Sequence, residues 1–114
     1  MPCLILNTSQ ALDEQQKDNV CLAVSAKTAD LLSKPESYVM VLIKDQQTMS
    51  FAGSTEPSAY IELKSLGLPE NQTTELSRRL CEHIAELINV PQNRIYIEFS
   101  SPERHMWGWD GRTF

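Results

Sequence analysis

The sequence predicts an α/β (α+β) fold in which two pseudo-symmetric βαβ units form a four-stranded mixed sheet with two helices on one face. Length is the first observation, because 114 residues are too few for two domains of usual size, so we expect one domain over residues 1–114. Strand-sized apolar runs alternate with helical stripes. The order strand, helix, strand also occurs twice, in pseudo-repeats about 2–51 and 58–107: Ile5 corresponds to Ile61 and Pro35 to Pro91, each 56 residues apart.

The first repeat opens with a short apolar run, 4–7, that is typical of a buried strand. Asp13 followed by Gln16 predicts a capping-box start for a helix that runs to Leu32 and is closed by Pro35. An apolar stripe is expected on one helix face, made of Val20, Val24, Lys27 and Leu31.

After this helix the run 38–43 predicts a central strand, apolar on both sides. A turn at 44–46, a short strand around 49–51 and a loop at 53–57 complete the first repeat.

The second repeat has the same order. Residues 59–66 predict a strand, and Gly67 and Pro69 end it. A helix follows with one apolar face, closed by Pro91, and then a strand at 94–99 and a turn at 107–111. The apolar face consists of Leu76, Leu80, Ile84, Leu87 and Ile88.

Each strand–helix–strand crossover makes its two strands parallel, which places both helices on one face of the sheet. The chain has no further element to cover the other face. Because we expect the central strands to be apolar on both sides, we expect copies of the same chain to cover that face in a closed homo-oligomer.

The composition excludes several function classes. Fifteen acidic against ten basic residues give a net charge of −5, which disfavours nucleic acid and anionic membranes as partners. No apolar run reaches the ~20 residues of a membrane span, and no signal peptide is evident, so we expect a cytoplasmic protein. The three cysteines form no CxxC pair, and the two histidines have no metal-ligand spacing, so we expect neither metal nor cofactor.

Pro2 is the candidate for chemistry. Removal of Met1 would give the chain a secondary amine at the head of a buried strand. An α-amino group has an ordinary pKa of about 7.7–8.0, and burial or a nearby cation lowers it, which gives the neutral nitrogen that a general base needs. The alternative is that Pro2 is only a terminal residue at a position that needs no amide donor.

Five separated motifs together span essentially the whole chain: Pro2–Thr8, Lys34–Val39, Phe51–Pro57, Asn93–Ile97 and Gly108–Phe114. They resemble the macrophage migration inhibitory factor (MIF) family of the tautomerase superfamily. The resemblance implies a homotrimer, with sites at subunit interfaces and Pro2 as catalytic base. It implies keto–enol tautomerisation of phenylpyruvate-like aromatic α-keto acids, with weak activity on dopachrome, and it leaves unconventional secretion open.

By the same resemblance, Lys34 binds the substrate carboxylate and lowers the pKa of the proline, and Tyr96 of a neighbouring subunit donates to the enolate. Taken alone, Lys34 could equally be a helix-end cation and each aromatic residue ordinary packing. Glu98 stands where the family often has asparagine, so we expect it to repel a carboxylate and weaken activity. Trp107 is expected to narrow the pocket. The remaining implied pocket residues are Tyr38, Ser65, Leu66, Trp109 and Phe114.

The alternative function is a MIF-like cytokine mimic or partner-binding protein with a vestigial pocket. Two features of the vertebrate cytokine are missing: its CxxC is replaced by 58–61, and its receptor-mimicking arginine falls near Leu12. These losses disfavour receptor binding, whereas a pure ligand would not need Pro2, Lys34 and Tyr96 together.

Overall fold

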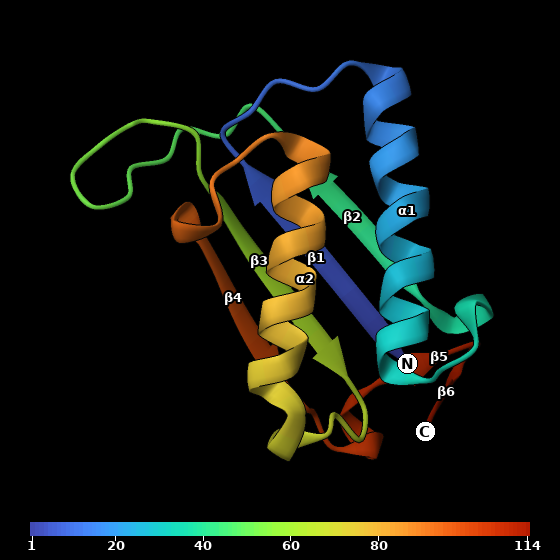
Figure 1. The fold of residues 1–114 in the computed structure, drawn as a ribbon. Helices are drawn as coiled ribbons and strands as arrows, with labels where there is room; N and C mark the ends of the chain where they lie inside the picture. Colours follow the sequence, from blue (N-terminus) through green and yellow to red (C-terminus); the bar gives the residue numbers. More distant parts are fainter.

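A computed structural model describes residues 1–114 and contains one four-stranded sheet and two helices (Figure 1). The sheet has the spatial order β2-β1-β3-β4; β1 is parallel to β2, antiparallel to β3, and β3 is parallel to β4. The predicted fold of two βαβ units in one mixed sheet is therefore confirmed. Neither helix is both long and apolar enough to span a bilayer. The bounds are β1 Pro2–Thr8, α1 Glu14–Leu32, β2 Met40–Lys44, β3 Ala59–Ser65, α2 Thr73–Ile88 and β4 Ile95–Ser100.

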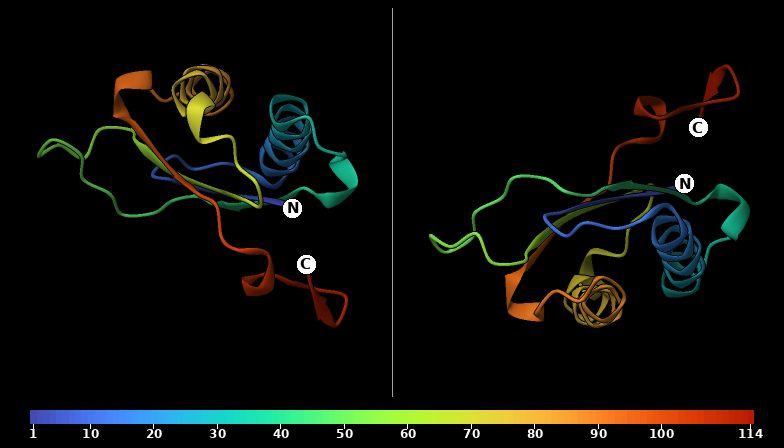
Figure 2. Two further views of the ribbon diagram at one scale, coloured as in Figure 1. Left: turned by 90° about the horizontal axis from the view of Figure 1, so that it is seen from below. Right: turned by 90° about the horizontal axis from the view of Figure 1, so that it is seen from above.

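Both helices cover the same face of the sheet, as the two end-on views show (Figure 2). α2 contributes residues at four-residue spacing, and every second residue of β1 and β3 meets them from the sheet. This layer is the hydrophobic core of the chain. Its most deeply buried members are Leu4, Leu6, Val24, Ile61, Leu63, Leu80 and Ile84.

The start of α1 is the predicted capping box. The Asp13 side chain accepts from the Gln16 backbone N–H at 2.8 Å, and the Gln16 side chain accepts from the Asp13 N–H at 2.9 Å. The predicted stripe was partly wrong, because the buried residues after Val20 and Val24 are Thr28, Ala29 and Leu32. A regular four-residue step keeps the buried face on Thr28 and leaves Lys27 and Leu31 half-buried at its border.

Both helices end alike, 56 positions apart, with a left-handed residue: Ser33 at φ 52° and Asn89 at φ 56°. After α1, the Lys34 backbone N–H reaches back to the Ala29 carbonyl at 3.0 Å, which is the bond of a Schellman ending. The helix therefore stops before Pro35, and this ending fixes the direction in which the chain leaves toward β2.

Two expectations for the first repeat were wrong. The strand after α1 begins only at Met40, because residues 36–38 form a 3-10 turn (η1), and it lies at an edge of the sheet instead of its centre. No strand forms around 49–51. Phe51 makes only an isolated bridge to Ser54, because the sheet of a single chain ends at β2 and offers this segment no partner strand.

The face of the sheet opposite the helices is open but not uniformly apolar, so the expectation of central strands that are apolar on both sides was wrong for β3. On this face β2 presents the exposed residues Met40 and Leu42, whereas β3 presents Glu62 and Lys64. Alternation along β3 places one polar residue on this face for each core residue on the other.

The C-terminal segment lies on the open side of the sheet (Figure 2). It forms a small hairpin of β5 (Gly108–Trp109) and β6 (Arg112–Thr113). Asp110 and Gly111 both have positive φ, at 53° and 76°, which is the geometry of the type I′ turn that Asp-Gly favours. The hairpin lies at the sheet end at which β1 begins (Figure 1).

Candidate functional site

The hairpin and the start of β1 enclose a mainly apolar cavity of about 350 Å³, here called the aromatic cavity. It brings together five of the predicted site residues: Pro2, Tyr38, Trp107, Trp109 and Phe114. The other lining residues are Met1, Cys3, Ser37, Val39, Met40 and Gly108.

The aromatic wall of this cavity is held by ring contacts. Trp109 and Phe114 stack with centroids 5.9 Å apart and planes 7° from parallel, and Tyr38 meets Trp109 edge-on at 5.9 Å. The Arg112 guanidinium lies 5.0 Å from the centre of the Trp109 ring, on the other strand of the hairpin. Such pairs contribute about 0.5–1.5 kcal/mol beyond area burial, so the wall is preformed and suited to an aromatic ligand.

A second cavity of about 430 Å³ adjoins the first and is here called the basic cavity. Two cations line it, Lys34 and Arg104, and no acidic residue does. Met1, Tyr38 and Phe114 line both cavities and therefore form the partition between them. The remaining residues of the basic cavity are Ser33, Pro35, Leu66 and Gly67.

The amino terminus lies where the two cavities meet. Burial lowers the pKa of the Met1 amine, and the charges of Lys34 and then Arg104 lower it further. Both effects oppose the charged form of an amine, so this position favours a neutral nitrogen. The Pro2 side chain is fully buried directly beside it.

Lys34 is half-buried, and its Nζ donates to the Leu66 carbonyl at 3.0 Å. An ammonium group has three N–H bonds, so two remain for an anion in the basic cavity. Ser65 is fully buried opposite Pro2 in the β1–β3 register, and its hydroxyl also donates to the Leu66 carbonyl, at 3.3 Å. The residue directly after β3 thus anchors the Lys34 side chain near the amino terminus.

Tyr96 and Glu98, two further predicted site residues, line neither of these cavities. Tyr96 pairs with Tyr60 on β3, whereas Pro2 pairs with Ser65, five residues further along that strand. At ~3.4 Å per residue, this separation is about 17 Å along the sheet, beyond the reach of a tyrosine side chain. A single chain therefore does not bring Tyr96 to its own Pro2.

The Glu98 carboxylate accepts a hydrogen bond from the Tyr60 hydroxyl at 2.7 Å on the open face, and this bond raises the pKa of Tyr60 to about 12. Neither residue lines the two cavities of the same chain.

Tyr96 is exposed, and the Phe51 ring packs on it at 4.8 Å. Arg94 holds the loop that carries Phe51, because its guanidinium lies 5.3 Å from the ring centre and donates four hydrogen bonds to backbone carbonyls. The accepting carbonyls belong to Phe51, Ser54, Glu56 and Pro57.

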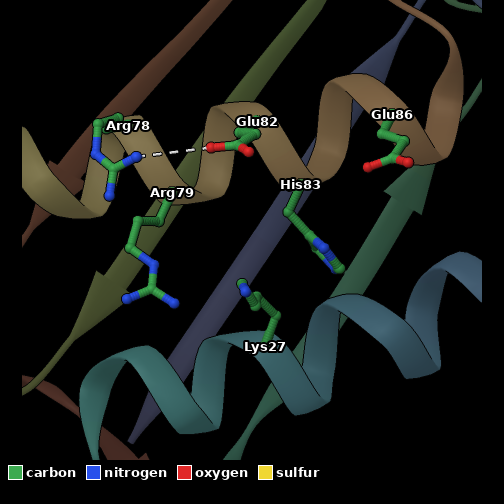
Figure 3. A pocket seen from close by; sticks show the side chains of 6 residues that line it. All are labelled: Lys27, Arg78, Arg79, Glu82, His83 and Glu86. Atoms are coloured by element: carbon green, nitrogen blue, oxygen red, sulfur yellow. Dashed lines mark ion pairs between the residues drawn. The ribbon is translucent and has the colours of Figure 1, made fainter.

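A third hollow, of about 370 Å³, lies between α1 and α2 and is lined only by polar side chains (Figure 3). Arg78 pairs there with Glu82 at 3.7 Å and with Glu75 at 2.6 Å, while the His83 Nε2 is buried without a partner. The hollow has no apolar wall for a ring. No group of three or more His, Cys, Asp or Glu side chains is placed to hold a metal ion.

Sequence reasoning missed two of the residues that define the cavities, Met1 and Arg104. Met1 was expected only as a residue to be removed, and its role as a partition depends on the packing of the hairpin. Arg104 lies in a 3-10 turn (η4, Arg104–Met106) between β4 and β5, where no periodicity marks a direction. Its place in the same cavity as Lys34 is visible only in the folded chain.

Comparisons with known proteins agree with this architecture. The family model described as macrophage migration inhibitory factor (MIF) matches residues 1–114. A MIF homolog from Trichinella spiralis is 36% identical over 115 residues, covering 100% of both chains, and a MIF from Xenopus tropicalis is 32% identical, covering 100% of this chain and 99% of the relative. The crystal structure of a MIF homologue from Prochlorococcus marinus has a TM-score of 0.90 and 37% identity, and covers 98% of each chain.

Proposed function

Because the chain belongs to the macrophage migration inhibitory factor family, we propose that it is a cofactor-independent keto–enol tautomerase for phenylpyruvate-like α-keto acids. Pro2 is the general base once Met1 has been removed. With Met1 attached, the Pro2 nitrogen is part of a peptide bond and is not basic. The proposed activity therefore depends on processing of the chain start.

The observation that carries the proposal is the place of Met1 between the two cavities. Removal of Met1 would join a cavity walled by aromatic rings to one that holds two cations, with the Pro2 nitrogen at the junction. A phenylpyruvate molecule has the matching halves, an aromatic ring and a carboxylate on either side of the carbon that loses a proton. The site thus suits both the substrate and the position of the base.

The pKa of the proline amine should be lowered for the reasons that lower the pKa of the Met1 amine, namely burial and the charges of Lys34 and Arg104. In the reaction, the neutral nitrogen takes a proton from the carbon next to the keto group. The C–H electron pair forms the carbon–carbon double bond, and the carbonyl oxygen receives a proton to give the enol. Lys34 binds the carboxylate and stabilises the negative charge that develops beside it.

We further propose a homotrimer in which Tyr96 of a neighbouring subunit completes each site. Two observations support it: Tyr96 is exposed on the open face, and it lies about 17 Å along the sheet from its own Pro2. The exposed Met40 and Leu42 on the edge strand β2 would gain cover from a neighbouring copy. Sedimentation or native mass spectrometry measures the oligomeric state directly.

The test of the function combines intact mass with a phenylpyruvate tautomerase assay on the same preparation, alongside the Pro2→Gly variant. We expect activity only in protein without Met1, and a large loss in Pro2→Gly, whose terminal amine has neither the ring nor its fixed position. A halopyruvate should also label the proline amine selectively. A processed trimer that is no more active than the variant would refute the proposal and favour a partner-binding protein with a vestigial pocket.

A further inference from the structure

The Arg104 guanidinium makes no ion pair, hydrogen bond or ring contact, unlike the guanidinium groups of Arg78, Arg94 and Arg112. The ion pairs of the chain are made by Lys17, Arg78 and His105. Arg94 donates to backbone carbonyls, and Arg112 stacks on an indole ring. Arg104 instead lines the basic cavity, and its charge reaches the chain amino terminus. An arginine in this situation is free to bind an anion bidentately.

The charge balance of the basic cavity is also uneven. Lys34 and Arg104 contribute two positive charges, and no Asp or Glu side chain lines the cavity. A neutral base at Pro2 adds no charge, so a monoanionic keto acid would leave one of the two cations without a counter-charge. A ligand with two negative charges would satisfy both.

The two cations approach the chain start from different elements. Lys34 follows the end of α1 and is fixed by its bond to the Leu66 carbonyl, whereas Arg104 begins η4, which leads into the hairpin. Both act on the amine at the chain start. Both line the same cavity beside this amine, so a substrate held at the Pro2 nitrogen would have two cations there for its anionic groups.

We propose that Arg104 binds a second carboxylate, and that the site prefers 2-oxo dicarboxylic acids in which the carbon that loses the proton lies between the keto carbon and the second carboxylate, as in 2-oxosuccinate. The proposal rests on the tautomerase function proposed above and names its substrate class. Lys34 binds the carboxylate next to the keto group, and Arg104 binds the distal one. The proton moves from carbon to the Pro2 nitrogen and a proton is added to the carbonyl oxygen, so the reaction is an isomerisation that needs no co-reactant.

The experiment compares kcat/KM for 2-oxosuccinate and phenylpyruvate in Met1-free protein, as initial rates in metal-free buffer with the uncatalysed rate subtracted. The variants are Arg104→Ala, the charge-retaining Arg104→Lys, and Arg79→Ala as matched control, since Arg79 is an exposed arginine in the hollow between the helices. We expect Arg104→Ala to lower the 2-oxosuccinate to phenylpyruvate ratio about tenfold, through KM, because a charge-assisted hydrogen bond is lost. Arg104→Lys should restore most of the ratio, and Arg79→Ala should leave it unchanged.

A binding measurement separates this inference from the function on which it rests. Malate and phenyllactate resemble the two substrates but lack the keto group, so they report binding without turnover; calorimetry should show that Arg104→Ala weakens malate alone. Phenylpyruvate turnover with an unchanged ratio and unchanged malate binding would overturn the inference and leave the tautomerase intact. Absence of turnover with both acids would overturn the tautomerase and, with it, the assigned substrate class, whereas Arg104-dependent malate binding would still support the anion site.

Discussion

Replacing Lys34 by methionine should have two separate effects, one on the binding of the substrate carboxylate and one on the pKa of the proline amine. The Lys34 Nζ has one bond to Leu66, which leaves two N–H groups for the substrate carboxylate. A hydrogen bond to a charged group contributes about 1.5–3 kcal/mol, so kcat/KM for phenylpyruvate should fall about ten- to hundredfold, mainly through KM. Methionine keeps most of the apolar volume of the stem, so the cavity wall stays filled.

The second effect of Lys34→Met appears in the pH profile. The base is active when neutral, and the positive charge of Lys34 lowers the amine pKa. Removing that charge raises the pKa of the proline, so the ascending limb of kcat/KM against pH should move to higher pH. Lys27→Met, on the same helix but in the hollow between α1 and α2, is the control and should change neither quantity. An unmoved ascending limb together with an unchanged KM would refute the assignment of Lys34.

Three further predictions concern the scaffold. Leu80→Ala, at a fully buried position of α2, should lower the free energy of unfolding by about 3–5 kcal/mol, measured by urea denaturation at fixed subunit concentration. Asp13→Ala should cost about 1 kcal/mol by removing the capping box of α1, whereas Asp13→Asn, which still caps, should cost much less. Arg94→Ala removes four hydrogen bonds to the loop that carries Phe51, so amide exchange should speed up over residues 51–57 and kcat should fall with the loss of support for Tyr96; unchanged exchange would contradict this role.

The fold could be predicted from the sequence because its helices and strands are marked by periodic apolar residues and by short local motifs. Four-residue spacing predicted the buried face of α2, and the Asp13–Gln16 pair predicted the start of α1. The resemblance supplied seven of the seventeen residues that line the two cavities: Pro2, Lys34, Tyr38, Leu66, Trp107, Trp109 and Phe114. The features that the sequence did not predict depend on contacts between residues that are far apart in the sequence. An apolar run such as 38–43 does not reveal whether its strand lies at the centre or the edge of a sheet.

The charge of the site was the other part that sequence reasoning could not reach. Arg104 is one of ten basic residues, and nothing in its local pattern distinguishes it from the others. Its significance comes from the 3-10 turn that places it in the same cavity as Lys34, where no Asp or Glu side chain lies. The position of Tyr96, far from its own Pro2, likewise follows from strand register and not from sequence.

The internal repeat has a consequence for how many reactive centres one chain can hold. The residue equivalent to Lys34 in the second unit, 56 positions later, is Val90, which is buried and uncharged. The equivalent of Pro2 is Ser58, which lies in the middle of the chain. Its backbone N–H donates to the Ser9 hydroxyl. A free terminal amine exists once per polypeptide, so duplicating the backbone could not duplicate a base of this kind. Under the proposed mechanism the second unit can supply side chains to a site but no second terminal amine, so only additional subunits can add reactive centres.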